Sequence, residues 1–213
     1  MPIRYLTCLL VCEGVSDRWF LAELLRRALD SMCSVRCRHV VEVEIDYVLA
    51  DHQRPANILD ALGSVGRFDL LLYHHDGAPP MVSQTKVAEV CSSLAEYRSE
   101  LVLPVVPIRE TEAWMLADPE AVAGLCGVQA GRVIEAGVPA RAGDVESIRD
   151  PKQLLKSVLC ETARAHNGSR IPREDLFRRL GETVDLDRLR EVQSFARWWS
   201  DMTEALVEMG YKQ

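Results

Sequence analysis

Three short apolar segments, each ending abruptly at charged residues, constrain the fold of this chain more than any other feature. They are Arg4–Cys12, Phe68–Tyr73 and Leu101–Ile108. Each has the length and apolar content of a buried strand, and segments with helical periodicity lie between them. Strands that alternate with helices are typical of parallel sheets. With an alternating strand pattern over 38–48, the sequence predicts an α/β fold with a mostly parallel sheet flanked by helices.

Polar residues follow three of these predicted strands. The first strand runs into Glu13-Gly14, the second into His74-His75-Asp76-Gly77, and the third into Arg109-Glu110-Thr111-Glu112. In open α/β sheets, ligands bind beyond the carboxyl ends of the strands. We therefore expect Glu13, Asp76 and the Glu110/Glu112 pair to converge in space.

The second half of the chain has a different character. Five glycines punctuate 119–150, which predicts a loop-rich stretch, and helices are predicted over 151–166, 172–180 and 186–209. Ser16 is expected to cap the helix that follows the first strand. We predict an α/β core over 1–118 and a mainly helical C-terminal extension over 119–213, packed on that core.

Composition and charge narrow the class of protein. Hydrophobic residues make up 48% and charged residues 27% of the chain, as in ordinary globular domains. No apolar run reaches the ~18 residues that favour a membrane span, and no cleavage site follows the first apolar run, so we expect a cytoplasmic protein without membrane contact. Residues 1–148 hold 13 basic and 21 acidic residues, which excludes a generic nucleic-acid surface there.

The seven cysteines contain no Cys-x-x-Cys pair. Cys33, Cys37 and His39 form the one cluster in the sequence that resembles part of a zinc site. A structural zinc site needs four ligands and no second pair is visible, so we favour an ordinary helix-to-strand connection there.

The acidic strand ends suggest a divalent metal, Mg or Mn. Carboxylates gathered on loops repel one another and stay ionised together most easily around a hard cation, which can polarise a phosphodiester. Glu13 and Asp76 are the candidate catalytic residues, and Glu13, Asp76, Glu112 and His74 are the candidate metal ligands. Arg109 and Lys152 are candidate substrate-binding residues, because either side chain can contact phosphate.

Each candidate also has a purely structural interpretation. Glu13 could be an acid favoured by a helix dipole, Asp76 could shape a turn with Gly77, and Glu112 could cap a helix. Arg109 could pair with a nearby acid, and Lys152 could lie on a solvated helix face.

The segment Glu13-Gly14-Val15-Ser16-Asp17 after an apolar strand resembles the first motif of the Toprim domain, found in topoisomerases, bacterial primases and overcoming-lysogenization-defect nucleases. More of the chain is similar to a Toprim-like bacterial family known as domain of unknown function 4276. The similarity includes Glu112-Ala113-Trp114-Met115-Leu116-Ala117-Asp118 and Asp150-Pro151-Lys152. This resemblance implies a metal-dependent nuclease that acts on nucleic acid beside an ATPase partner in antiviral defence.

The chain departs from the Toprim pattern at the second motif. That motif is Asp-x-Asp, whereas His74-His75-Asp76-Gly77-Ala78 supplies a single Asp. Histidine suits manganese, iron or zinc better than magnesium. Two hypotheses follow: a metal-dependent phosphodiester-cleaving enzyme, or a catalytically degraded module that docks a partner protein. A homodimer is compatible with either.

Overall fold

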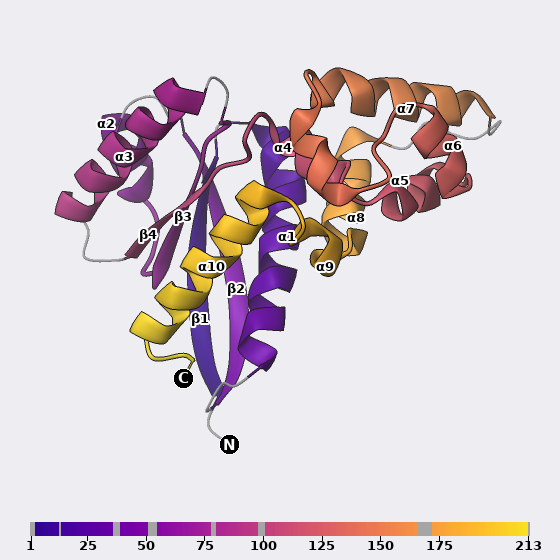
Figure 1. Ribbon diagram of the computed structural model, residues 1–213. Helices are drawn as coiled ribbons and strands as arrows, with labels where there is room; N and C mark the ends of the chain where they lie inside the picture. Colours follow the sequence, from indigo (N-terminus) through magenta and orange to yellow (C-terminus); the bar gives the residue numbers. More distant parts are fainter. Residues whose placement is uncertain are drawn as a thin grey trace.

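A parallel sheet forms the centre of the molecule. The computed structural model describes residues 3–12, 14–35, 39–50, 55–77, 80–97, 101–165 and 172–212. Its strands are β1 (Ile3–Cys12), β2 (Val40–Leu49), β3 (Leu70–His74) and β4 (Leu101–Val105). They lie in the order β2-β1-β3-β4, and every neighbouring pair is parallel (Figure 1). The predicted α/β fold with a parallel sheet flanked by helices is confirmed.

Helices cover both faces of the sheet. Successive side chains of β1 point to opposite faces, so its apolar residues contribute to a core on each side. Leu6, Cys8 and Leu10 belong to the core formed with α1 (Val15–Ser34) and α10 (Gln193–Glu208). Leu9 and Val11 belong to a second core, formed with α2 (Pro55–Leu62) and α3 (Pro80–Tyr97). The C-terminal helix thus supplies part of the layer that begins with α1 (Figure 1).

The remaining helices lie beside the upper part of α1 (Figure 1). They are α4 (Thr111–Met115), α5 (Pro119–Cys126), α6 (Ala130–Glu135), the 3-10 helix η1 (Ala142–Ser147), α7 (Pro151–Ala165), α8 (Arg173–Thr183) and α9 (Leu186–Leu189). Among the helices described, none has both the length and the apolar character needed to cross a bilayer.

The strand order creates a switch point between β1 and β3. After β1 the chain forms β2, which lies on one side of β1 in the sheet. It then forms β3 on the other side of β1, and β4 beyond β3. The two connections therefore diverge at the carboxyl ends of β1 and β3, and this divergence is where open α/β sheets form their ligand crevices.

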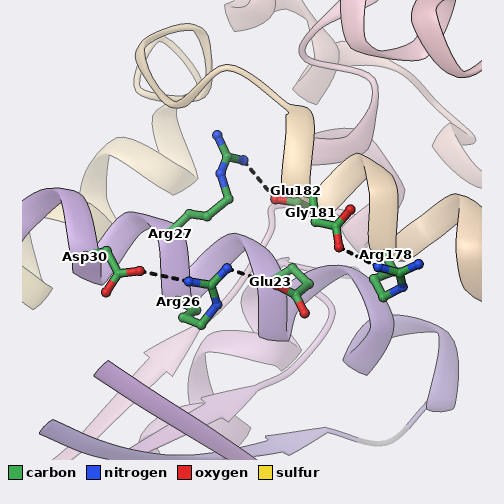
Figure 2. Close-up of polar contacts among 7 residues, drawn as sticks. All are labelled: Glu23, Arg26, Arg27, Asp30, Arg178, Gly181 and Glu182. Carbon is green, nitrogen blue, oxygen red and sulfur yellow. Dashed lines mark hydrogen bonds and ion pairs between the residues drawn. The ribbon is translucent and has the colours of Figure 1, made fainter. Parts of the chain in front are cut away.

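Helix α8 lies closely against α1. Gly181 of α8 has no side chain, and a Cβ atom there would lie 2.5 Å from the carbonyl oxygen of Phe20 in α1. Arg27 of α1 donates a hydrogen bond to the carbonyl oxygen of Gly181 at 2.8 Å (Figure 2). It donates a second one to the carbonyl oxygen of Val184 at 3.0 Å. Arg27 thereby satisfies carbonyls at the end of α8 that have no partner within that helix.

Three local predictions are wrong. Helix α1 begins at Val15 with Gly14 at its N-cap and no side-chain cap, so Ser16 lies inside the helix. The stretch 119–150 was predicted to be rich in loops, but it holds short helices. Its glycines Gly127 and Gly137 adopt positive φ and lie at helix ends.

The third wrong prediction is the single helix over 186–209, which is divided into α9 and α10. Arg188 of α9 donates to the carbonyl oxygens of Ala117 and Ala140, which holds α9 against the other short helices. The amide of Ser194 in α10 donates to Glu146 Oε1 at 3.0 Å. Each segment therefore has its own polar anchor, although Leu189 of α9 and Phe195 of α10 belong to the same core.

Candidate functional site

The end of β3 carries a buried histidine in a defined tautomer. His74 is 2% exposed, and its Nδ1 lies 2.9 Å from the carbonyl oxygen of Val105 on β4. A carbonyl oxygen only accepts, so Nδ1 carries the proton. In the neutral ring, Nε2 then accepts from the Thr111 hydroxyl at 3.2 Å. His74 is fixed by β4 and α4 and presents Nε2 toward the switch point.

Asp76 follows two residues later and has a strongly perturbed carboxyl group. Its Oδ1 lies 3.7 Å from His74 Nε2. The pKa of Asp76 is raised to about 7, chiefly by burial and in addition by the charges of Asp17 and Glu110, while a backbone hydrogen bond from Thr111 and the charge of Lys152 oppose the shift. A carboxyl with a pKa near neutrality at a crevice is suited to moving a proton or to binding a cation.

The start of α4 places two further acids at this edge of the sheet. Glu112 is 3% exposed, and burial raises the pKa of its carboxyl group. Its Oε1 lies 3.7 Å from Arg173 Nη2 on α8 and 4.0 Å from Lys152 Nζ on α7. Glu110 Oε2 accepts from the Lys152 amide at 3.3 Å. The two acids therefore connect the sheet edge to the beginnings of α7 and α8.

The β1 end supplies Asp17 from the first turn of α1. Asp17 acts on the pKa of both Asp76 and Glu112, so its charge lies close to theirs. Gly14 leaves space for this side chain, because a Cβ atom at Gly14 would lie 2.5 Å from Asp17 Oδ2. Glu13, the first candidate from the sequence, lies outside the described residues. We call the described acids, Asp17, Asp76, Glu110 and Glu112, the switch-point cluster.

The structure thus brings together Asp76, His74, Glu112 and Lys152 of the predicted site. Arg109 is half-buried, and its Nε is buried without a hydrogen bond to any described residue. Among the described residues, which omit Glu13, no group of three His, Cys, Asp or Glu side chains is arranged to hold a metal ion. The metal-ligand and catalytic roles of these residues stay predictions.

Sequence reasoning missed Asp17, Thr111 and Arg173 as members of this site. Asp17 reads as an ordinary first-turn acid, although its spacing of four residues from Glu13 was a usable signal. Thr111 stands between two candidate acids in the sequence. Arg173 had no local signal, because only the packing of α8 brings it to Glu112.

The raised pKa of Asp76 predicts a specific pH dependence of stability. An unfolded Asp titrates near pH ~4, whereas Asp76 in the folded protein titrates near 7. Folding therefore binds a proton between these values, and the free energy of unfolding contributed by Asp76 falls as the pH rises through this window. The Asp76 side chain is 48% exposed, so solvent screening reduces the size of the effect.

We expect Asp76→Asn to gain stability relative to the wild type between pH 5 and pH 8. Urea unfolding at several pH values measures this gain, and Asp201→Asn, at an exposed position on α10, is the matched control. Parallel profiles of the wild type and Asp76→Asn would show that Asp76 titrates normally.

A family model described as "Domain of unknown function (DUF4276)" matches residues 12–203. No curated protein and no solved structure matches the chain.

Proposed function

The chain belongs to the DUF4276 family of domains of unknown function, and we propose that it is a metal-dependent phosphodiester-cleaving enzyme of the Toprim type, acting on nucleic acid. The observation that carries this proposal is the switch-point cluster. Acids from α1, the β3 end and α4 lie close enough that Asp17 and Glu110 raise the pKa of Asp76. Like charges held together in this way favour binding of a cation.

The donor chemistry of the cluster fits a hard divalent cation. Carboxylate oxygens are the ligands that Mg²⁺ and Mn²⁺ prefer. Asp76 and Asp17, with Glu13 from the β1 end, would hold the ion, which when bound polarises the phosphodiester and stabilises the leaving oxygen. Glu112 contributes differently, because its carboxylate already faces two cationic side chains.

The other residues supply binding and packing. Lys152 Nζ and the half-buried Arg109 provide positive charge for the substrate phosphate beside the acids of the site. His74 packs beside Asp76, with its Nδ1 held by the Val105 carbonyl oxygen and its Nε2 3.7 Å from Asp76 Oδ1.

Cleavage assays test this proposal. Single- and double-stranded DNA and RNA are incubated with the protein in Mg²⁺, Mn²⁺ or EDTA. We expect metal-dependent cleavage, and a loss of about a hundredfold or more in Asp76→Asn and Glu13→Gln, because each removes a negative ligand charge. Asp201→Asn is the matched control and should retain full activity. Cleavage that survives in EDTA or in both site variants would refute the assignment.

A second candidate function is a binding module without catalysis. The contacts of His74 and the incomplete second motif favour it. Either alignment with the Toprim Asp-x-Asp pattern lacks one carboxylate, at His74 or at Ala78, and both ring nitrogens of His74 already contact protein groups. In this case the protein would dock a partner such as an ATPase or a second copy. Mn²⁺ distinguishes the two candidates: the enzyme binds it and shifts the Asp76 titration to lower pH, whereas the module leaves that titration unchanged.

A further inference from the structure

The sheet has an uncovered surface at the opposite end from the switch point. On β1, Leu9 and Val11 are buried by the α2 and α3 layer, but Ile3 and Tyr5 on the same face are 51% and 55% exposed. Val40, the partner of Ile3 in the strand register, is 51% exposed. We call this surface the open face. Parallel sheets normally have both faces covered, so the open face is an exception that needs a physical explanation.

The open face is strongly acidic. Glu42, Glu44 and Asp46 alternate along β2, and all are exposed. Asp69, just before β3, lies beside Thr7 of β1, whose amide and hydroxyl both donate to Asp69 Oδ2 at 2.9 Å. Thr7 is in turn the register partner of Glu44. None of these four acids forms an ion pair with a basic side chain in the part of the chain that the structure describes.

The β2 edge beside the open face has no strand partner among the described residues. β2 is the terminal strand in the order β2-β1-β3-β4 and has ten residues without proline. The opposite edge strand, β4, has five residues and contains Pro104, which cannot donate to a further strand. On the α1 side of β2, Val41, Val43 and Ile45 are half-buried apolar residues. A long edge strand of this kind is a template for another strand.

We propose that the free edge of β2 binds an extended basic segment of a partner protein as an additional strand. The segment alternates Lys or Arg with apolar residues. Its basic side chains lie beside Glu42, Glu44 and Asp46, since alternate strand residues are spaced about 7 Å apart on one face. Its apolar side chains lie beside Val41, Val43 and Ile45. Main-chain hydrogen bonds supply affinity, and the two alternating rows of side chains supply specificity.

The charge of the open face favours a basic partner segment over a second copy of the chain. Two β2 strands paired edge to edge would place their own carboxylates on the same face. Like charges opposite one another destabilise strand pairing. A basic segment instead neutralises the face.

Peptide binding tests the inference independently of the proposed function. The probe is a fluorescent Lys-Val-Lys-Ile-Lys-Val-Lys peptide, and its counterpart has Glu in place of Lys. We expect the basic peptide alone to bind, more weakly at higher salt. We also expect Glu42→Lys/Glu44→Lys to weaken binding about tenfold or more. The matched control is Glu204→Lys/Glu208→Lys, which makes the same charge change at exposed positions of α10 and should leave binding intact.

Three outcomes would overturn the proposal. The first is equal binding to the two charge-reversed proteins, which would indicate attraction to net charge. The second is undiminished binding of a peptide methylated at alternate backbone nitrogens, which would exclude strand addition. The third is a wild-type dimer in sedimentation that the Glu42→Lys/Glu44→Lys protein no longer forms, since this would assign the edge to a second copy. Circular dichroism confirms that both variants are folded.

Discussion

Gly181→Ala is expected to lower the free energy of unfolding by about 2–3 kcal/mol, although alanine normally stabilises helices. The added Cβ would lie 2.5 Å from the carbonyl oxygen of Phe20 and 3.0 Å from the Glu23 Cβ. The first contact is with backbone, so no side-chain rotation relieves it. Helix α8 must move away from α1, which also strains the hydrogen bond of Arg27 to Gly181 (Figure 2) and the one to Val184.

Gly124→Ala is the matched control for this prediction. Gly124 lies in α5, it is exposed, and a Cβ there meets nothing within 4 Å. The same substitution should therefore raise stability by up to about 1 kcal/mol through helix propensity alone. Urea or thermal unfolding followed by circular dichroism measures both variants. Similar changes in the two proteins would mean that α8 does not lie against α1 at Gly181.

Gly77→Ala is expected to destabilise the protein by about 3 kcal/mol and to disturb the switch-point cluster as well. A Cβ at Gly77 would lie 2.1 Å from the Pro107 carbonyl oxygen and 2.7 Å from that of Ile108. The loop after β3 is therefore packed against the loop after β4 with no space for a side chain. This contact holds Asp76 near Glu110 and Thr111, so separating the loops should return the pKa of Asp76 toward its ordinary value.

Two measurements check this prediction. Unfolding gives the loss of stability, and NMR titration of the Asp76 carboxyl group reports the change at the site. Gly66→Ala is the control, because Gly66 is exposed and a Cβ there meets nothing within 4 Å. An Asp76 titration that stays near pH 7 in a destabilised Gly77→Ala protein would show that the loop contact does not shape the cluster.

Local patterns were sufficient for the strands and for part of the site. The apolar runs of β1, β3 and β4 are short and end at polar residues, so their type and their carboxyl ends follow from periodicity. Parallel strands place those ends at one edge of the sheet, which is why His74, Asp76 and Glu112 could be grouped before any coordinates. Helix ends were less predictable, because a glycine in the sequence is compatible with a loop and with a helix end. Gly127 and Gly137 suggested loops but lie at helix ends.

The sequence by itself determined a parallel α/β sheet and the convergence of polar strand ends, since both depend on short-range patterns. The tertiary structure decided the strand order, which sets the switch point and places β2 at one end of the sheet in the part of the chain that the structure describes. It also decided that α10 shares a layer with α1, and that Lys152 and Arg173 face Glu112. These arrangements join segments far apart in the chain, and side-chain packing across that distance leaves no periodic trace in the sequence.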